Sequence, residues 1–102
     1  MEELQEKLKE FYIKEEEIYD LYYNHGADST AIHEETLPSG EIVNHTKEMV
    51  IKEKIIDLCQ KISSFVNNTR DEYAIADAKR VMSRLQDIIV AYFKEEANKY
   101  KF

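Results

Sequence analysis

The three histidines of the chain all lie between residues 25 and 45, a stretch that also contains both glycines and the only proline. Histidine and carboxylate side chains placed together could bind a divalent metal ion or form a pH-sensitive contact. If this stretch forms a hairpin, His33 faces His45 and shares one face of the two strands with Glu35. The spacing matches no established metal-binding motif, so we interpret these three residues as a contact surface without a metal ion or other cofactor.

Two pairs of carboxylates, Glu16 with Asp20 and Glu53 with Asp57, are spaced one helical turn apart. They resemble the acidic helix pairs of the all-helical nucleotide pyrophosphohydrolases, which bind magnesium, although the spacing departs from that family's Glu-Glu-x-x-Glu and Glu-x-x-Asp pattern. The resemblance implies a small metal-dependent hydrolase. Glu15 is a further carboxylate in an apolar stripe. It is either partly exposed or paired with a basic residue of another helix, or else it is a buried acid with a raised pKa or a metal ligand.

The tyrosines indicate a protein-binding surface more strongly than any motif indicates catalysis. Four of them fall between residues 12 and 23 among carboxylates, and one face of one helix cannot cover all four. Exposed tyrosine beside acids is typical of protein interfaces, although tyrosines at the rim of a small core are the alternative. We expect Tyr23 to be exposed. The predicted partner-binding residues are Glu16, Tyr19, Asp20, Tyr22, Tyr23, His33, Glu35 and His45.

The net charge of −7 is concentrated in the first half of the chain. Residues 1–24 contain eight acids and three lysines, and residues 25–45 contain four acids and no lysine or arginine. A surface of this kind repels phosphate, which disfavours direct nucleic-acid binding and favours a basic protein partner.

Three segments have apolar residues at helical spacing, which predicts an all-α domain spanning residues 1–102. We expect helices over residues 2–24, 47–67 and 70–99, joined by a connector over residues 25–45. Only residues 67–69 separate the last two helices, so these should form an antiparallel pair that the first helix covers. The resulting architecture is a small three-helix antiparallel bundle.

Particular residues predict where these helices begin and end. His25 and Gly26 should end the first helix, with the glycine in the left-handed conformation, and Thr46 should cap the second. Thr69 and Glu72 have the spacing of a capping box at the start of the third.

Two structures fit the connector. Leu37-Pro38-Ser39-Gly40-Glu41 is suited to a three-residue hairpin loop, which would pair Thr36 with Ile42 and pack Ile32 and Ile42 on the helices. The competing structure is a short helix that begins at Asp28 or Ser29 and ends at Leu37.

The third helix should be about 45 Å long and extend beyond the other two. An apolar overhang, together with the aromatic residues Tyr92, Phe93, Tyr100 and Phe102, favours a homodimer. Cys59 is the only cysteine and lies within an apolar stripe, which predicts a buried and inert thiol.

From these observations we expect a non-enzymatic, acidic protein-interaction module in the cytoplasm that does not contact a membrane. No Gly-rich phosphate loop, Ser/His/Asp arrangement or Cys-x-x-Cys motif supports catalysis. The abundance of Lys, Ile, Asn and Tyr suggests a phage or mobile-element protein that inhibits a host factor. The alternatives are a self-assembling virion or scaffold protein and the metal-dependent hydrolase.

Overall fold

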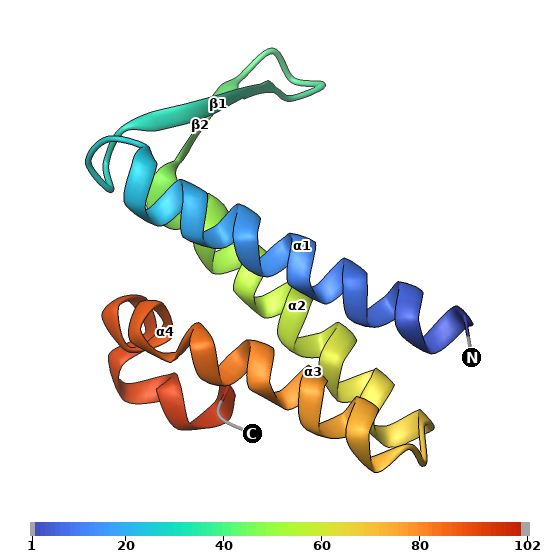
Figure 1. Ribbon diagram of the computed structural model, residues 1–102. Coiled ribbons are helices and arrows are strands. Elements are labelled where there is room, and N and C mark those ends of the chain that lie inside the picture. Colours follow the sequence, from blue (N-terminus) through green and yellow to red (C-terminus); the bar gives the residue numbers. More distant parts are fainter. Residues whose placement is uncertain (1, 101–102) are drawn as a thin grey trace.

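The computed structural model describes the backbone of residues 2–100 and the side chains of residues 4–100. Within this range the chain is mostly helical, with four α-helices and one small antiparallel sheet of two strands. In chain order the elements are α1 (Glu2–Asn24), β1 (Ala31–Thr36), β2 (Ile42–Thr46), α2 (Lys47–Asn68), α3 (Glu72–Arg84), α4 (Gln86–Phe93) and the 3₁₀-helix η1 (Lys94–Tyr100). Figure 1 shows α1 beside α2, the sheet projecting from one end of this pair, and α4 and η1 folded back next to α3.

The predicted bounds of the first helix are confirmed by α1, but the predicted role of Gly26 is wrong. Among the described residues, Gly40 alone has a positive φ, of 88°. The carbonyls of His25 and Gly26 each accept a hydrogen bond of 2.9 Å from the Nζ of Lys47 instead. Lys47 of α2 therefore binds two backbone carbonyls just beyond the end of α1, next to the negative end of the helix dipole.

The predicted cap of α2 is confirmed, because the side chain of Thr46 accepts a hydrogen bond from the backbone N–H of Met49. The predicted capping box of Thr69 and Glu72 is wrong. Asp71 caps α3, and its Oδ1 accepts hydrogen bonds from the backbone N–H groups of Tyr73 (3.0 Å) and Ala74 (3.2 Å). Thr69 instead follows α2 and donates its backbone N–H to the last turn of that helix.

The prediction of one helix over residues 70–99 is wrong. The chain bends at Leu85, whose N–H bonds to the carbonyls of Val81 and Ser83, and then forms α4 and η1. Ile88 and Ile89 are adjacent in sequence and both are fully buried. The bend brings α4 back over the core, so the predicted overhang is not formed. The overhang was one of two grounds for the expected homodimer, and the homodimer itself stays a prediction. Phe102 lies outside the described residues.

One apolar core joins all four α-helices. Its fully buried side chains include Ile18 of α1, Ile55, Leu58 and Ile62 of α2, Val81 and Met82 of α3, and Ile88 and Ile89 of α4. The rings of Phe11 and Phe65 meet edge to face at 5.5 Å and close the core between α1 and α2. Cys59 is only half-buried, and this burial raises the pKa of its thiol, which disfavours the reactive thiolate.

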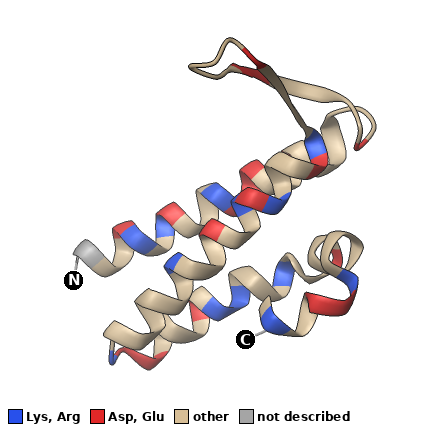
Figure 2. Ribbon diagram, turned by 180° about the vertical axis from the view of Figure 1, so that it is seen from behind, with Lys and Arg blue, Asp and Glu red and all other residues tan. Residues whose placement is uncertain are grey.

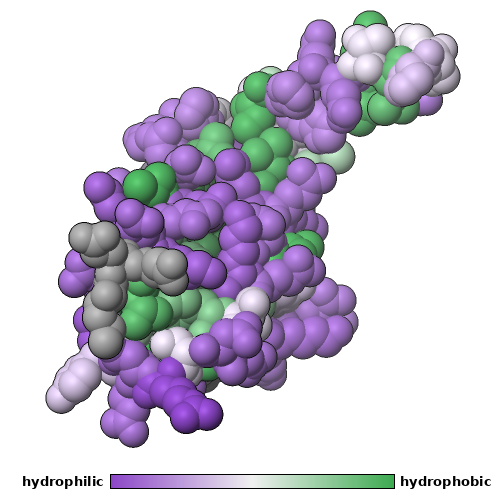
Figure 3. Space-filling view, turned by 90° about the vertical axis from the view of Figure 1, so that its right-hand side faces the viewer, coloured by the Kyte–Doolittle hydropathy of each residue, from purple (hydrophilic) through white to green (hydrophobic). Residues whose placement is uncertain are grey.

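The hairpin expected in the connector is confirmed, and the competing short helix is not formed. Thr36 pairs with Ile42, Glu35 with Val43 and His33 with His45, as predicted, and the register shifts between His33 and Ala31. The expected packing is wrong, because Ile42 is 61% exposed. Figure 3 shows this hairpin, which we call the arm (residues 31–46), standing clear of the helices at the upper right.

Candidate functional site

A row of side chains on α1 faces away from the core. Ile13, Glu16, Asp20 and Tyr23 are spaced by three or four residues, so they lie along one side of the helix, and all four are exposed. We call these four residues the outer face of α1. A shallow hollow along this face is also lined by the neighbouring Tyr19. Exposed apolar surface next to two carboxylates is the type of surface that the tyrosine-rich sequence predicted.

Tyr23 is 64% exposed, as expected, yet its ring is held by two neighbours. It stacks on the ring of Tyr19 with centroids 6.0 Å apart and meets the ring of Tyr22 edge to face at 4.9 Å. The hydroxyl of Tyr19 donates to the backbone carbonyl of Arg84 in α3. Burial raises the pKa of Tyr19, and the nearby carboxylate of Glu15 raises it further. Tyr23 is therefore the outermost ring of a cluster that is fixed to the core.

The predicted partner-binding residues fall into two groups. Glu16, Tyr19, Asp20 and Tyr23 lie together on or beside the outer face of α1. Tyr22 is half-buried and meets the ring of Tyr92 in α4 edge to face. The other predicted residues lie on the arm, which extends from the end of α1 in Figure 1. Sequence reasoning missed Ile13. Its position outside the apolar stripe of its helix could have indicated that this side chain is exposed.

The arm presents its histidines in the predicted arrangement. The rings of His33 and His45 are 5.4 Å apart, and the Nε2 of His45 lies 3.0 Å from the Oε2 of Glu35. Figure 2 shows acidic and no basic residues along the arm. Among the side chains of residues 4–100, no group of three or more His, Cys, Asp and Glu residues is placed to hold a metal ion.

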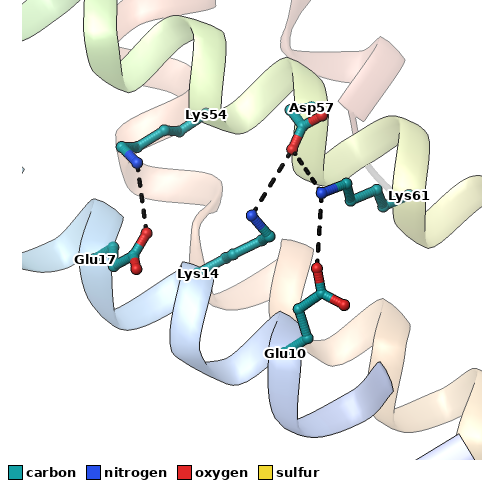
Figure 4. A network of polar contacts seen from close by, with 6 residues as sticks. All are labelled: Glu10, Lys14, Glu17, Lys54, Asp57 and Lys61. Atoms are coloured by element: carbon teal, nitrogen blue, oxygen red, sulfur yellow. Dashed lines mark hydrogen bonds and ion pairs between the residues drawn. The ribbon is translucent and has the colours of Figure 1, made fainter. Parts of the chain in front are cut away.

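One member of each carboxylate pair that resembles those of the pyrophosphohydrolases, Asp57 and Asp20, contacts other side chains. Asp57 lies 3.9 Å from the Nζ of Lys14 and 3.2 Å from the Nζ of Lys61, within the ion-pair network between α1 and α2 in Figure 4. Asp20 accepts a hydrogen bond from Asn24 on its own helix. Through its contact with Lys14, Asp57 contributes to holding α1 and α2 together.

Glu15 is a buried carboxylate, with 4% of its surface exposed. Its Oε2 lies 3.8 Å from a guanidinium nitrogen of Arg84. The predicted burial and the predicted pairing with a basic residue of another helix are therefore both confirmed, and the expected partial exposure is wrong. Burial raises the pKa of Glu15, the charge of Arg84 opposes the shift, and Glu16 adds to it. Arg84 also lies over the ring of Tyr12 at 5.7 Å, which places its guanidinium between an aromatic ring and a carboxylate.

Glu15→Gln is expected to raise the free energy of unfolding at pH 7. A folded-state pKa above the ordinary value of 4.5 means that folding favours the protonated carboxyl. The contribution of the Glu15 carboxyl to the free energy of unfolding is therefore fully present below pH 4.5. It is lost as the pH rises through the pKa of the folded state. Urea unfolding at pH 4 and pH 7 measures the effect: wild type and variant should agree at pH 4 and differ at pH 7. Glu16→Gln is the exposed control, and an equal gain from both variants would contradict the prediction.

Lys47 is the buried charge that sequence reasoning missed, with 7% of its surface exposed. Besides the two carbonyls at the end of α1, its Nζ lies 3.7 Å from the Oδ1 of Asp28 and 5.4 Å from the centre of the Tyr22 ring. The same Asp28 oxygen accepts a hydrogen bond of 2.6 Å from the hydroxyl of Tyr92. Burial and this hydrogen bond raise the pKa of the Tyr92 hydroxyl. Lys47 therefore connects the end of α1, the start of α2 and α4.

A second hollow, of about 400 Å³, lies between the start of α1 and the end of α2. Phe11 and Phe65 contribute to its lining, and Glu10 and Lys61 at its side pair with each other at 3.6 Å. Nothing in its lining favours a particular ligand, so we place the candidate site on the outer face of α1.

Within residues 2–100, no helix combines the length and apolar character that spanning a bilayer requires. No protein-family model, curated protein or solved structure matches this chain.

Proposed function

We propose that this chain is a small, acidic, non-enzymatic protein-interaction module whose outer face of α1 binds a basic surface of another protein. The observation that carries the proposal is the pairing of exposed apolar side chains, Ile13 and Tyr23, with the carboxylates of Glu16 and Asp20 on one helix face. The apolar groups supply area that binding removes from water, and the carboxylates select a basic partner.

The ring contacts of Tyr23 with Tyr19 and Tyr22 support the same proposal. A side chain that is already fixed loses little conformational freedom on binding, so more of its contact energy contributes to affinity. The arm adds further acidic surface next to the end of α1, with no basic residue of its own. On the sequence grounds given above, we propose that the partner is a host protein and that the chain inhibits it.

Site-specific photo-crosslinking tests the proposal. The chain carrying a photoreactive amino acid at position 13 is incubated with host lysate and irradiated, and crosslinked proteins are identified by mass spectrometry. The control carries the same group at position 73, because Tyr73 on α3 is 87% exposed and lies outside the proposed surface. A partner captured from position 13 and not from position 73 is the expected result.

Substitutions then measure the contribution of the surface to affinity for that partner. Tyr23→Ala is expected to weaken binding by about tenfold, as for an aromatic residue at the centre of an interface. Tyr73→Ala removes the same side chain elsewhere and should leave the affinity unchanged. Equal effects of the two substitutions, or crosslinks from position 73 alone, would show that the partner binds a different surface.

A further inference from the structure

Two cations of this chain each lie against a tyrosine ring of α1 and near a carboxylate. Arg84 lies over the Tyr12 ring at 5.7 Å, with the Glu15 carboxylate 3.8 Å from its guanidinium. Lys47 lies 5.4 Å from the centre of the Tyr22 ring, with the Asp28 carboxylate 3.7 Å from its Nζ. In both cases a tyrosine of α1 supplies a π-face and a carboxylate supplies the opposite charge.

The outer face of α1 has the same two components without a cation from this chain. Asp20 precedes Tyr23 by three residues, and Glu16 precedes Asp20 by one turn, so the two carboxylates and the ring lie along one side of the helix. Among the described residues, neither Glu16 nor Asp20 forms an ion pair with a lysine or arginine, and Asp20 has a contact of 3.5 Å with His25. Tyr23 exposes most of its surface, and its ring is held by Tyr19 and Tyr22.

We propose that the outer face of α1 binds an arginine side chain of the partner, with the guanidinium stacked on Tyr23 and paired with Asp20 and Glu16. This inference rests on the proposed function and specifies the chemistry that the partner must present. The occupant is a segment of another protein that carries an exposed arginine, with an apolar residue that can cover Ile13.

Arginine fits this surface better than lysine does. The guanidinium is planar, so it can stack on a tyrosine ring while its edge nitrogens donate hydrogen bonds to carboxylates. It is also less strongly hydrated than an ammonium group, so less solvation is lost when it leaves water. Arg84 shows the arrangement at a half-exposed position of this chain, whereas the lysine that contacts Tyr22 is buried and bonds to backbone carbonyls.

A peptide titration followed by NMR tests the inference with the full chain. The probe is a blocked hexapeptide of four alanines and two arginines, and its twin has lysine in place of each arginine. We expect amide shifts centred on residues 13–24 and tighter binding of the arginine peptide. Tyr23→Ala should weaken that binding about two- to fivefold, as the loss of an exposed cation–π contact predicts. Tyr23→Phe keeps the ring and should retain binding, and Tyr73→Ala is the matched control.

The results of the peptide titration and of the crosslinking experiment distinguish a failure of the arginine site from a failure of the proposed function. Equal binding of the two peptides, no effect of Tyr23→Ala, or shifts centred on the acidic arm would overturn the arginine site. If the crosslinking partner is nevertheless captured at position 13, the interaction surface stands and only its proposed chemistry fails. A dispersed amide spectrum of each variant confirms that it is folded, so a loss of binding is assigned to the removed side chain.

Discussion

Replacing Lys47 with alanine is expected to lower the free energy of unfolding by about 3 kcal/mol, because hydrogen bonds to charged groups contribute roughly 1.5–3 kcal/mol each when buried. The substitution removes the donor to the His25 and Gly26 carbonyls and leaves Asp28 without its nearest cation. It also removes the cation from the face of the Tyr22 ring. Urea unfolding monitored by circular dichroism at 222 nm measures the change.

Lys54→Ala provides the control on the same helix. Lys54 is more exposed and pairs with Glu17 at 3.4 Å, so its loss should cost less than about 1 kcal/mol. Lys47→Met separates packing from polar contacts, because methionine keeps most of the apolar length of the side chain but donates no hydrogen bond. An effect of Lys47→Ala no larger than that of Lys54→Ala would contradict the buried position of this ammonium group.

Ile89→Ala is expected to cost about 3 kcal/mol, in the range of fully buried aliphatic residues truncated to alanine. Ile89 has no exposed surface, whereas the adjacent Val90 is 48% exposed. Val90→Ala is therefore the matched control and should cost less than about 1 kcal/mol.

This comparison also tests the packing of α4 on the core. Leu85, Ile88 and Ile89 lie at spacings of three and four residues, so their side chains lie on one side of the chain, and all three are fully buried. Urea unfolding of the two variants measures the difference. Equal costs for Ile89→Ala and Val90→Ala would contradict the folding of α4 onto the core.

The parts of the fold that local patterns encode were predicted well. The stripe from Leu4 to Tyr22 marks α1, the Thr46 hydroxyl marks the start of α2, and the turn at Gly40 fixes the register of the hairpin. Each depends on residues that are neighbours in the sequence or one turn apart. The exposure of Tyr23 followed equally from local crowding, because one helix face cannot cover four tyrosines.

The features that sequence reasoning missed depend on distant parts of the chain. No glycine or proline follows Gly40, so no helix-breaking residue marks the bend at Leu85. Lys47 is buried because the carbonyls that end α1 arrive beside the start of α2. The outer face of α1 also depends on distant parts of the chain. The positions of α2 and α3 decide which side of α1 remains uncovered.

The separation of the arm from the helices has a practical consequence for protein engineering. The turn at residues 37–41 closes on itself, with the Leu37 N–H bonded to the Glu41 carbonyl and the Gly40 N–H bonded to the Leu37 carbonyl. Residues inserted there lengthen a loop whose two ends are already adjacent, at a small entropic cost. A peptide tag or a fluorescent domain could therefore be placed at the tip of the arm, leaving both chain termini and the outer face of α1 unmodified.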